Sequence, residues 1–225
     1  MYAPASPPQA YPATVGSTPT RHRERARYDR ATVHQILDEA LICHLGYLNA
    51  GRPVVLPTTH ARVGETLFLH GSTGSGPMLA VSRSGLPVCV TVTLVDGLVL
   101  ARAAMHHSLN YRSVVVLGTA HLVQDPAGKR RALAALLDHV APGRAADSRP
   151  PNSRELAATA VLALDLVEVS AKVRGGGPVD DAEDVALPHW AGVVPLGLAT
   201  GSPVSADDLD PAIPPPDYLR AYRRP

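Results

Sequence analysis

A short segment rich in glycine and hydroxyl residues constrains the fold more than any other part of the chain. The apolar run Thr66–Leu69 leads into His70-Gly71-Ser72-Thr73-Gly74-Ser75-Gly76, and Pro77 then opens a segment typical of a helix start. This order predicts a strand, a loop and a helix. Backbone N–H groups at a helix start, together with serine and threonine hydroxyls, can bind an anion. The sequence therefore predicts that this loop holds the phosphate of a cofactor.

Helical spacing of apolar residues precedes the loop and also follows the strand region. Val33, Ile36 and Leu37 predict a helix over about 30–40, with Thr32 and Gln35 as a capping box. Asp125-Pro126 predicts the start of a second amphipathic helix. Shorter helices are expected over 78–84 and 153–160.

The remaining apolar runs are rich in β-branched residues and predict strands. Asp96-Gly97 is a hairpin signal between two of them, and Gly118 indicates a bulge or barrel bend. The expected strands cover 41–48, 53–61, 66–70, 86–95, 98–103, 114–123 and 161–173. Consecutive strands joined by short turns favour an antiparallel sheet or barrel, with Asp165 and Glu168 on its solvated face.

Composition predicts loose ends around one globular unit. The chain has 22 prolines, and the sequence predicts a disordered tail over 1–23, a domain over 24–200 and an extended arm over 201–225. Aromatic residues make up only 4% of the chain, so the core must be aliphatic. The net charge of +1 argues against a nucleic acid or an anionic membrane as a partner.

The two cysteines, Cys43 and Cys89, are flanked by apolar residues and are expected to be buried thiols in a reducing compartment. No apolar run reaches the roughly 20 residues that span a bilayer, and the N-terminal residues lack the pattern of a signal peptide. The sequence therefore predicts a cytoplasmic protein.

Several common sites are excluded by spacing. Pro77 follows Gly76 where a phosphate-binding P-loop needs lysine, and Leu79 stands where a dinucleotide fingerprint needs its third glycine. Motifs of zinc enzymes and serine hydrolases are absent from the sequence. The acidic run Asp180–Asp184 is expected to be solvated, because no nitrogen or sulfur ligand accompanies it in the sequence. No metal site is predicted.

Three segments in order resemble the pyridoxamine 5′-phosphate oxidase-like superfamily, in the branch of flavin-nucleotide-binding and nitroimidazole-resistance-related proteins. They are HGSTGS after a strand, HHSLNYRSVVVLG before the next long strand, and SAKVRGGGPVDDAEDVALPHWAGVVPL near the end. The resemblance covers roughly residues 24–220. It implies a mainly β fold, a six-stranded antiparallel split barrel of Greek-key type with flanking helices, that binds FMN at the interface of a homodimer.

The same resemblance assigns the cofactor site. It implies that the loop binds the phosphate and ribityl chain and that a second segment lies across from it; the residues are His70, Gly71, Ser72, Thr73 and Ser75, with Asn110, Tyr111, Arg112 and Ser113. The planar guanidinium of Arg112 suits a phosphate. Relatives usually carry arginine or lysine where this chain has Gly76, so one expected cation is missing, and Arg83 could replace it.

The activity implied is that of an oxidoreductase on a small nitro- or quinone-like substrate. Trp190 could stack on the flavin or pack in a core, and His107 is the one weak catalytic candidate. An alternative is a haem-binding or haem-degrading protein with His70, His106 or His107 as axial ligand. Another is a flavin-binding module without catalysis.

Overall fold

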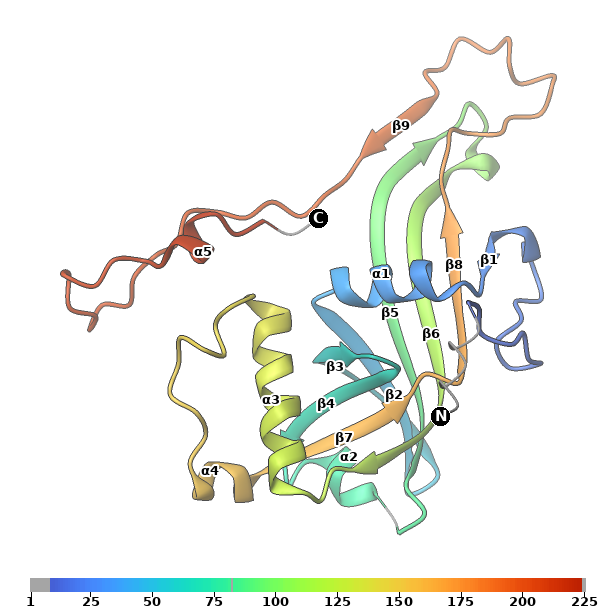
Figure 1. Cartoon of the computed structure of the whole chain (residues 1–225). Helices are drawn as coiled ribbons and strands as arrows, with labels where there is room; N and C mark the ends of the chain where they lie inside the picture. Colours follow the sequence, from blue (N-terminus) through green and yellow to red (C-terminus); the bar gives the residue numbers. More distant parts are fainter. Residues whose placement is uncertain (1–8, 82, 224–225) are drawn as a thin grey trace, which may run out of the picture.

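Six antiparallel strands close into a barrel in the computed structural model, which describes residues 9–81 and 83–223 (Figure 1). Around the ring each strand pairs with the next, and β5 closes it by pairing with β2. The strands in ring order are β2 (Ile42–Asn49), β3 (Arg52–Val63), β4 (Thr66–Ser72), β7 (Thr159–Asp165), β6 (Ser108–Leu122) and β5 (Leu86–Leu100). The predicted six-stranded barrel is confirmed.

Short strands and helices surround this ring. β8 pairs with β6, β1 with β8 and β9 with β5. Helix α1 lies across β5, β6 and β8, while α3 lies along the side formed by β3, β4 and β7 (Figure 1). The elements are β1 (Ala26–Arg27), β8 (Glu168–Arg174), β9 (Gly192–Pro195), α1 (Arg30–Glu39), α2 (Gly76–Ala80), α3 (Pro126–Val140), α4 (Ser153–Ala158), α5 (Asp217–Arg220), and the 3-10 helices η1 (Arg23–Arg25) and η2 (Ala104–His106).

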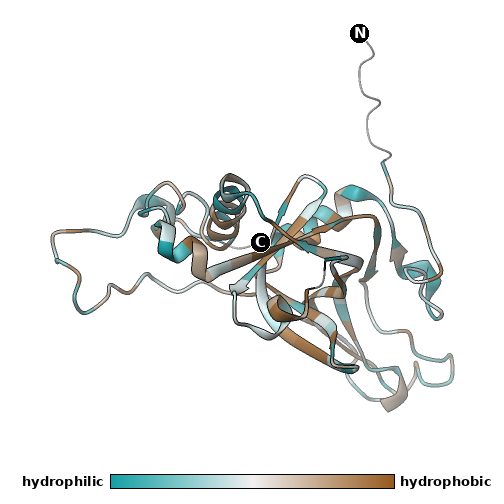
Figure 2. Cartoon of the chain, turned by 90° about the horizontal axis from the view of Figure 1, so that it is seen from below, coloured by the Kyte–Doolittle hydropathy of each residue, from teal (hydrophilic) through white to brown (hydrophobic). Residues whose placement is uncertain are grey.

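The core is aliphatic, as the composition predicts. Alternate residues of the strands point into the barrel, as in β5, where Val90 and Val92 are fully buried. Figure 2 shows hydrophobic colour along much of the barrel strands. Cys43 is buried among them and Cys89 partly so, both as free thiols, and burial raises the pKa of the Cys43 thiol to about 12.

The hairpin expected at Asp96-Gly97 is wrong. β5 continues through these residues and pairs with β6 on both sides of them, with a register shift between Val95 and Gly97. The Asp-Gly pair forms a bulge instead of a turn because β6 offers ladder partners beyond it, such as Leu109 for Leu98. The bulge leaves the Asp96 side chain free to contact a residue on β6.

The single long strand expected over 161–173 is also wrong. The chain bends at Leu166, whose N–H donates to Glu65 O over 2.8 Å, so that β7 pairs with β4 and β8 with β6. Asp165 is exposed, as expected. Gly118 lies in regular register; a Cβ there would be 2.8 Å from Leu164 Cδ1, so glycine permits a close approach and makes no bulge.

The N-terminal segment is packed where the structure describes it. Residues 1–8 of the predicted disordered tail lie outside the described residues, but Tyr11 is only 3% exposed. Its hydroxyl donates to Glu65 over 2.7 Å and lies 2.9 Å from His34 Nε2, and Arg30 stacks on its ring. The N-cap of helix α1 is Asp29, whose carboxylate accepts from Thr32 N, and not the expected capping box of Thr32 and Gln35.

The C-terminal extension, residues 175–223, leaves the barrel and returns to it. After β9 joins the edge of β5, the chain runs to the loop that follows α3, where Tyr218 Oη donates to Asp147 over 2.6 Å and Tyr222 Oη to Val140 O over 2.8 Å (Figure 1). Much of the expected arm over 201–225 is exposed, and its described part forms a short helix, α5. Among the described residues, no helix has the length and hydropathy to cross a bilayer.

Candidate functional site

The hydroxyl loop, residues 70–76, connects β4 to α2 as the sequence predicts. His70, Ser72 and Thr73 are exposed, so their side chains face solvent and not the core. β4 holds the start of the loop through its ladder with β7, in which His70 pairs with Val161. The loop thus presents an imidazole and two hydroxyls at one end of the barrel.

Backbone donors in this loop are already used. Thr73 N donates to Ala158 O over 3.0 Å, Gly74 N to Ser72 Oγ over 3.3 Å and Ser75 N to Ser72 O over 2.9 Å. The expected cradle of unpaired N–H groups is therefore weaker than the sequence suggests. The Ser75 hydroxyl differs, because it is buried without a hydrogen-bond partner in the described chain. A buried hydroxyl normally has a partner, so this atom fits a ligand group.

Gly76, where the resemblance leads us to expect a cation, lies against β2. A Cβ at this position would be 2.8 Å from the Tyr47 hydroxyl, so any side chain would have to move the tyrosine. The missing cation thus has a structural reason. Arg83 is exposed in the turn after α2.

Of the second predicted segment, Arg112 lines a cavity of about 400 Å³ beside β5 and β6, here called the arginine pocket. Its lining combines the barrel with the C-terminal extension: Glu39, Thr93, Leu94, Val95, Asp96, Arg112, Leu196, Gly197 and Leu198. Arg112 donates to both oxygens of Asp96, over 2.8 and 3.0 Å, and to both oxygens of Glu39. The bulge in β5 and the end of α1 supply these two carboxylates.

These hydrogen bonds already engage the guanidinium of Arg112, which the resemblance assigns to phosphate binding. Hydrogen bonds to Glu39 and then to Asp96 raise the pKa of Arg112, and the Glu39 side chain is only 8% exposed. A phosphate here would have to share the guanidinium with two carboxylates. Sequence reasoning missed both acids, because neither is near Arg112 in sequence.

Asn110 and Ser113, beside Arg112 on β6, bind β8 and the residues that follow it. Asn110 is buried, donates to Gly176 O over 3.1 Å and accepts from Arg174 over 2.6 Å. Ser113 Oγ donates to Lys172 O over 3.4 Å, and Tyr111 is half-buried in the ladder. These contacts fix the start of the C-terminal extension.

The structure does not bring the two predicted segments together within one chain. Gly76 contacts Tyr47, which pairs with Val88 of β5, whereas Arg112 pairs with Leu94 of β5. At about 3.3 Å per residue, these two positions on β5 are about 20 Å apart. In Figure 1, α2 lies at one end of the barrel and α1, whose last residue is Glu39, lies toward the other.

The candidate histidines differ in their partners. His70 is exposed on β4. His106 Nε2 lies 3.3 Å from Asp181 Oδ2, and His107 Nδ1 donates to Ala103 O over 3.1 Å, which leaves its Nε2 outward. Trp190 is 66% exposed and lies against Gly192, so in this chain it does not pack in the core.

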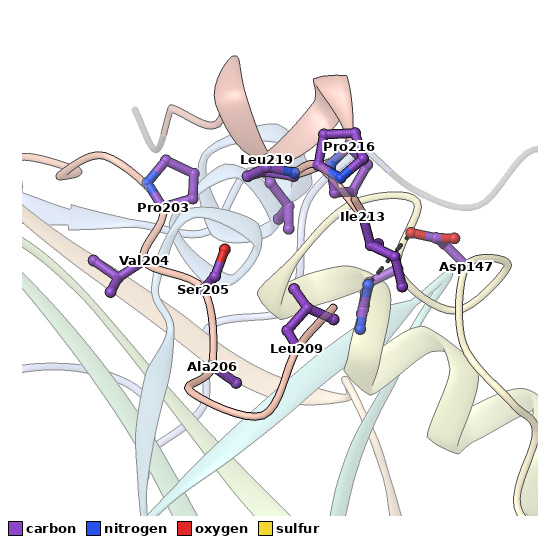
Figure 3. Close-up of a pocket in the computed structure, with 12 residues that line it drawn as sticks. Asp147, Pro203, Val204, Ser205, Ala206, Leu209, Ile213, Pro216 and Leu219 are labelled. Atoms are coloured by element: carbon purple, nitrogen blue, oxygen red, sulfur yellow. Dashed lines mark hydrogen bonds and ion pairs between the residues drawn. The ribbon is translucent and has the colours of Figure 1, made fainter. Parts of the chain in front are cut away.

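Another cavity, of about 520 Å³, lies between the C-terminal extension and the loop after α3 (Figure 3). Proline and aliphatic side chains from Pro203 to Leu219 line most of it, with Arg144 and Asp147 on the other wall. None of the predicted site residues is among those that line it.

Comparisons with known proteins agree on the fold. The sequence profile described as pyridoxamine 5′-phosphate oxidase matches residues 29–173. The solved structure of the flavocytochrome Anf3 from Azotobacter vinelandii is 38% identical, covers 93% of this chain and 97% of its own, and superposes with a TM-score of 0.88. No curated protein gives a significant match.

Two further solved structures differ in how much of the chain they match. The FAD and haem binding protein from Mycobacterium smegmatis is 38% identical over 87% of this chain and 96% of its own, with a TM-score of 0.82. A putative 5-nitroimidazole antibiotic resistance protein from Bacteroides thetaiotaomicron is 22% identical over 66% of this chain and 86% of its own, with a TM-score of 0.57. The latter shows a shared fold alone.

Proposed function

We propose, because the chain belongs to the pyridoxamine 5′-phosphate oxidase family, that it binds both a flavin and a haem and passes electrons between them. Bound flavin supplies hydride and single-electron chemistry, and haem iron supplies single-electron chemistry. The protein's own part is to hold the two groups close together and to limit the access of water.

One observation carries this proposal: two relatives that are each 38% identical match most of the chain. One is named a flavocytochrome and the other a FAD and haem binding protein. The family profile ends at residue 173. The Azotobacter vinelandii structure covers 93% of this chain, so the residues it leaves unmatched are fewer than those of the C-terminal extension. The likeness therefore includes much of that extension. The nitroimidazole-resistance structure covers only 66% of the chain, so about a third of the chain has no counterpart in it.

The hydroxyl loop is the proposed flavin contact. Ser72 and Thr73 offer exposed hydroxyls, and Ser75 offers a buried hydroxyl that has no partner among the described residues. Such groups suit phosphate or ribityl oxygens. The name of the Mycobacterium smegmatis protein favours FAD over the FMN that the sequence resemblance implies, and the test below identifies the flavin.

Two histidines are the proposed haem ligands. His189 is the one histidine in residues 174–225, the part of the chain that the family profile lacks, and it is exposed. His70 is exposed on the barrel, beside the hydroxyl loop. His106 is less suited because its Nε2 faces Asp181. His107 remains an alternative, since an Nδ1–H bonded to a backbone carbonyl orients Nε2 toward a metal.

The same proposal includes a homodimer. The β5 residues that pair with Tyr47, beside the hydroxyl loop, and with Arg112, in the arginine pocket, are about 20 Å apart in one chain. We therefore place the loop of one chain and the arginine pocket of its partner at one flavin. Large exposed apolar side chains such as Leu79 and Met105 are consistent with a covered surface. Light scattering on the purified protein should give the mass of a dimer, and a monomer would contradict this part of the proposal.

The visible spectrum of the purified protein tests the cofactors. A Soret band together with flavin absorption is expected, with about one haem and one flavin per chain, and mass spectrometry of the released flavin separates FAD from FMN. A protein that takes up neither group on reconstitution would overturn the proposal. Reduction by NADH or NADPH, followed by oxidation with a nitro- or quinone-like compound, tests the reductase activity that the resemblance implies.

Histidine variants locate the haem. His189→Ala and His70→Ala should each reduce haem affinity by about tenfold or more and shift the Soret band, because each removes an axial ligand. His121→Ala is the matched control, since His121 is exposed on β6 and belongs to neither proposed site. Unchanged spectra for both ligand variants, with a loss in His107→Ala, would assign the axial ligand to His107, which follows η2.

A further inference from the structure

Three metal-ligating side chains from two distant segments meet beside η2. His106 ends η2, and Asp181 and Asp184 lie in the C-terminal extension. One ligand atom from each residue lies within 4.8 Å of the others. No nitrogen ligand accompanies this acidic run in the sequence, and the fold brings His106 to it.

The spacing suits a small metal ion. Zinc binds imidazole nitrogen and carboxylate oxygen at about 2.0–2.2 Å, so neighbouring ligand atoms in a tetrahedral site are about 3.3–3.5 Å apart. His106 Nε2 and Asp181 Oδ2 are 3.3 Å apart. Asp184 is held near them by a turn in which its N–H donates to Asp181 O over 2.9 Å. Small rotations of the Asp184 side chain complete the set.

The two segments are fixed to each other independently of any ion. Asp180 is 2% exposed on its side chain, and its carboxylate accepts from Arg102 N and from the Arg102 guanidinium, each over 2.9 Å. This anchor sets the position of Asp181 relative to η2. The ligands are therefore placed before an ion binds, which reduces the ordering cost of binding.

Local charge also favours a cation. Arg102 neutralises Asp180, while Asp181, Glu183 and Asp184 add negative charge at the surface. One imidazole and two carboxylates suit borderline divalent ions such as Zn²⁺ better than Mg²⁺ or Ca²⁺, which prefer oxygen alone.

We propose that His106, Asp181 and Asp184 bind one divalent transition-metal ion, with Zn²⁺ as the probe and water at the remaining position. The ion ties the start of the C-terminal extension to the connection between β5 and β6. This site is distinct from the flavin and haem sites proposed above, because it uses neither the hydroxyl loop nor His70, His107 or His189.

Calorimetric titration of Zn²⁺ into the full-length protein, after treatment with a chelator and its removal, tests the site. One ion per chain is expected, and His106→Ala and Asp184→Asn should each weaken binding by at least about tenfold. His107→Ala and Asp207→Asn are the controls, being a neighbouring histidine and an exposed aspartate of the same extension, and should bind as the native protein does.

Cobalt gives a second readout. Co²⁺ should produce visible absorption bands in difference spectra of the native protein, and these should be lost in His106→Ala and restored in part by His106→Gln, whose side chain can also bind a metal. Absence of Zn²⁺ binding in the native protein, equal binding in His106→Ala, or equal competition by Mg²⁺ would each overturn the proposal. Cofactor content does not decide the result, since His106→Ala, Asp184→Asn and Asp207→Asn keep the proposed haem and flavin residues.

Discussion

The barrel and the C-terminal extension are built on different physical principles. The barrel and its helices, residues 29–173, contain nearly all of the buried aliphatic core, most of it between paired strands. The extension is mostly exposed and is held by the ladder of β9 with β5 and by a few hydrogen bonds. The barrel therefore folds through hydrophobic burial, whereas the extension depends on surfaces that the barrel supplies. A buried barrel of this type can be shared by many relatives, whereas an exposed extension can carry a function that few of them have.

Removing the extension should have the largest effect on function. A chain ending at Arg174 should keep its flavin and lose most of its haem, because it lacks His189. A chain ending at Thr200 retains β9 and His189 and is the matched control. Haem and flavin content per chain, measured by absorbance, checks this; equal haem in the two truncated proteins would place the haem in the barrel alone.

Core packing should separate the two regions next. Leu162 of β7 is fully buried, whereas Leu198 in the extension is 66% exposed. Leu162→Ala should lower the free energy of unfolding by about 3 kcal/mol, since it leaves a cavity, and Leu198→Ala by less than about 0.5 kcal/mol. Urea denaturation gives both values. Similar losses would mean that the extension packs as tightly as the barrel, as it would if a partner subunit covered it.

The ion pairs of Arg112 should have a smaller but specific effect. Arg112→Ala removes the guanidinium that binds both oxygens of the Glu39 carboxylate, whose side chain is 8% exposed, and should cost about 2 kcal/mol of stability. Arg62→Ala removes a more exposed pair with Asp38 and should cost less than about 1 kcal/mol. Urea denaturation compares the two.

A second outcome for Arg112 would point to the cofactor. If Arg112→Ala left stability unchanged but reduced flavin affinity by about tenfold, its main contact would be the flavin phosphate, as the sequence resemblance implies. The double variant with Glu39→Gln should recover part of any lost stability, because it also removes the buried negative charge that Arg112 balances.

The smallest predicted effect concerns pH and the N-terminal segment. Burial, followed by the charge of Arg62 and then that of Arg30, lowers the pKa of His34, against an opposing effect of Asp38. The unfolded chain therefore binds the proton more readily, so stability is full above the unfolded pKa of about 6.5 and falls as the pH drops below it. His34→Gln should reduce this loss of unfolding free energy at acidic pH by less than about 1 kcal/mol. Unfolding free energies at pH 8 and pH 5.5 measure it; identical pH profiles would contradict it.

Local pattern was sufficient for much of the fold. The Asp125-Pro126 cap, the helical spacing from Val33 to Leu37 and the apolar run before His70 each gave the element that the structure contains. Failures occurred where a distant partner decides the outcome. Asp96-Gly97 forms a bulge because β5 still pairs with β6 beyond it. The run over 161–173 bends because its first half pairs with β4 and its second half with β6.

For the candidate site the division is sharper. The sequence alone determined that hydroxyl side chains follow β4, since strand, loop and helix signals are local. Only the tertiary structure decided that Arg112 binds Glu39 and Asp96, that Gly76 must leave room for Tyr47, and that His106 meets Asp181. Each of these contacts joins side chains far apart in the chain, and only closure of the barrel and return of the extension bring them within reach. Local propensity depends only on neighbouring residues and cannot predict such contacts. The side chains that meet at the candidate sites therefore depend on how the segments before and after the barrel pack onto its strands.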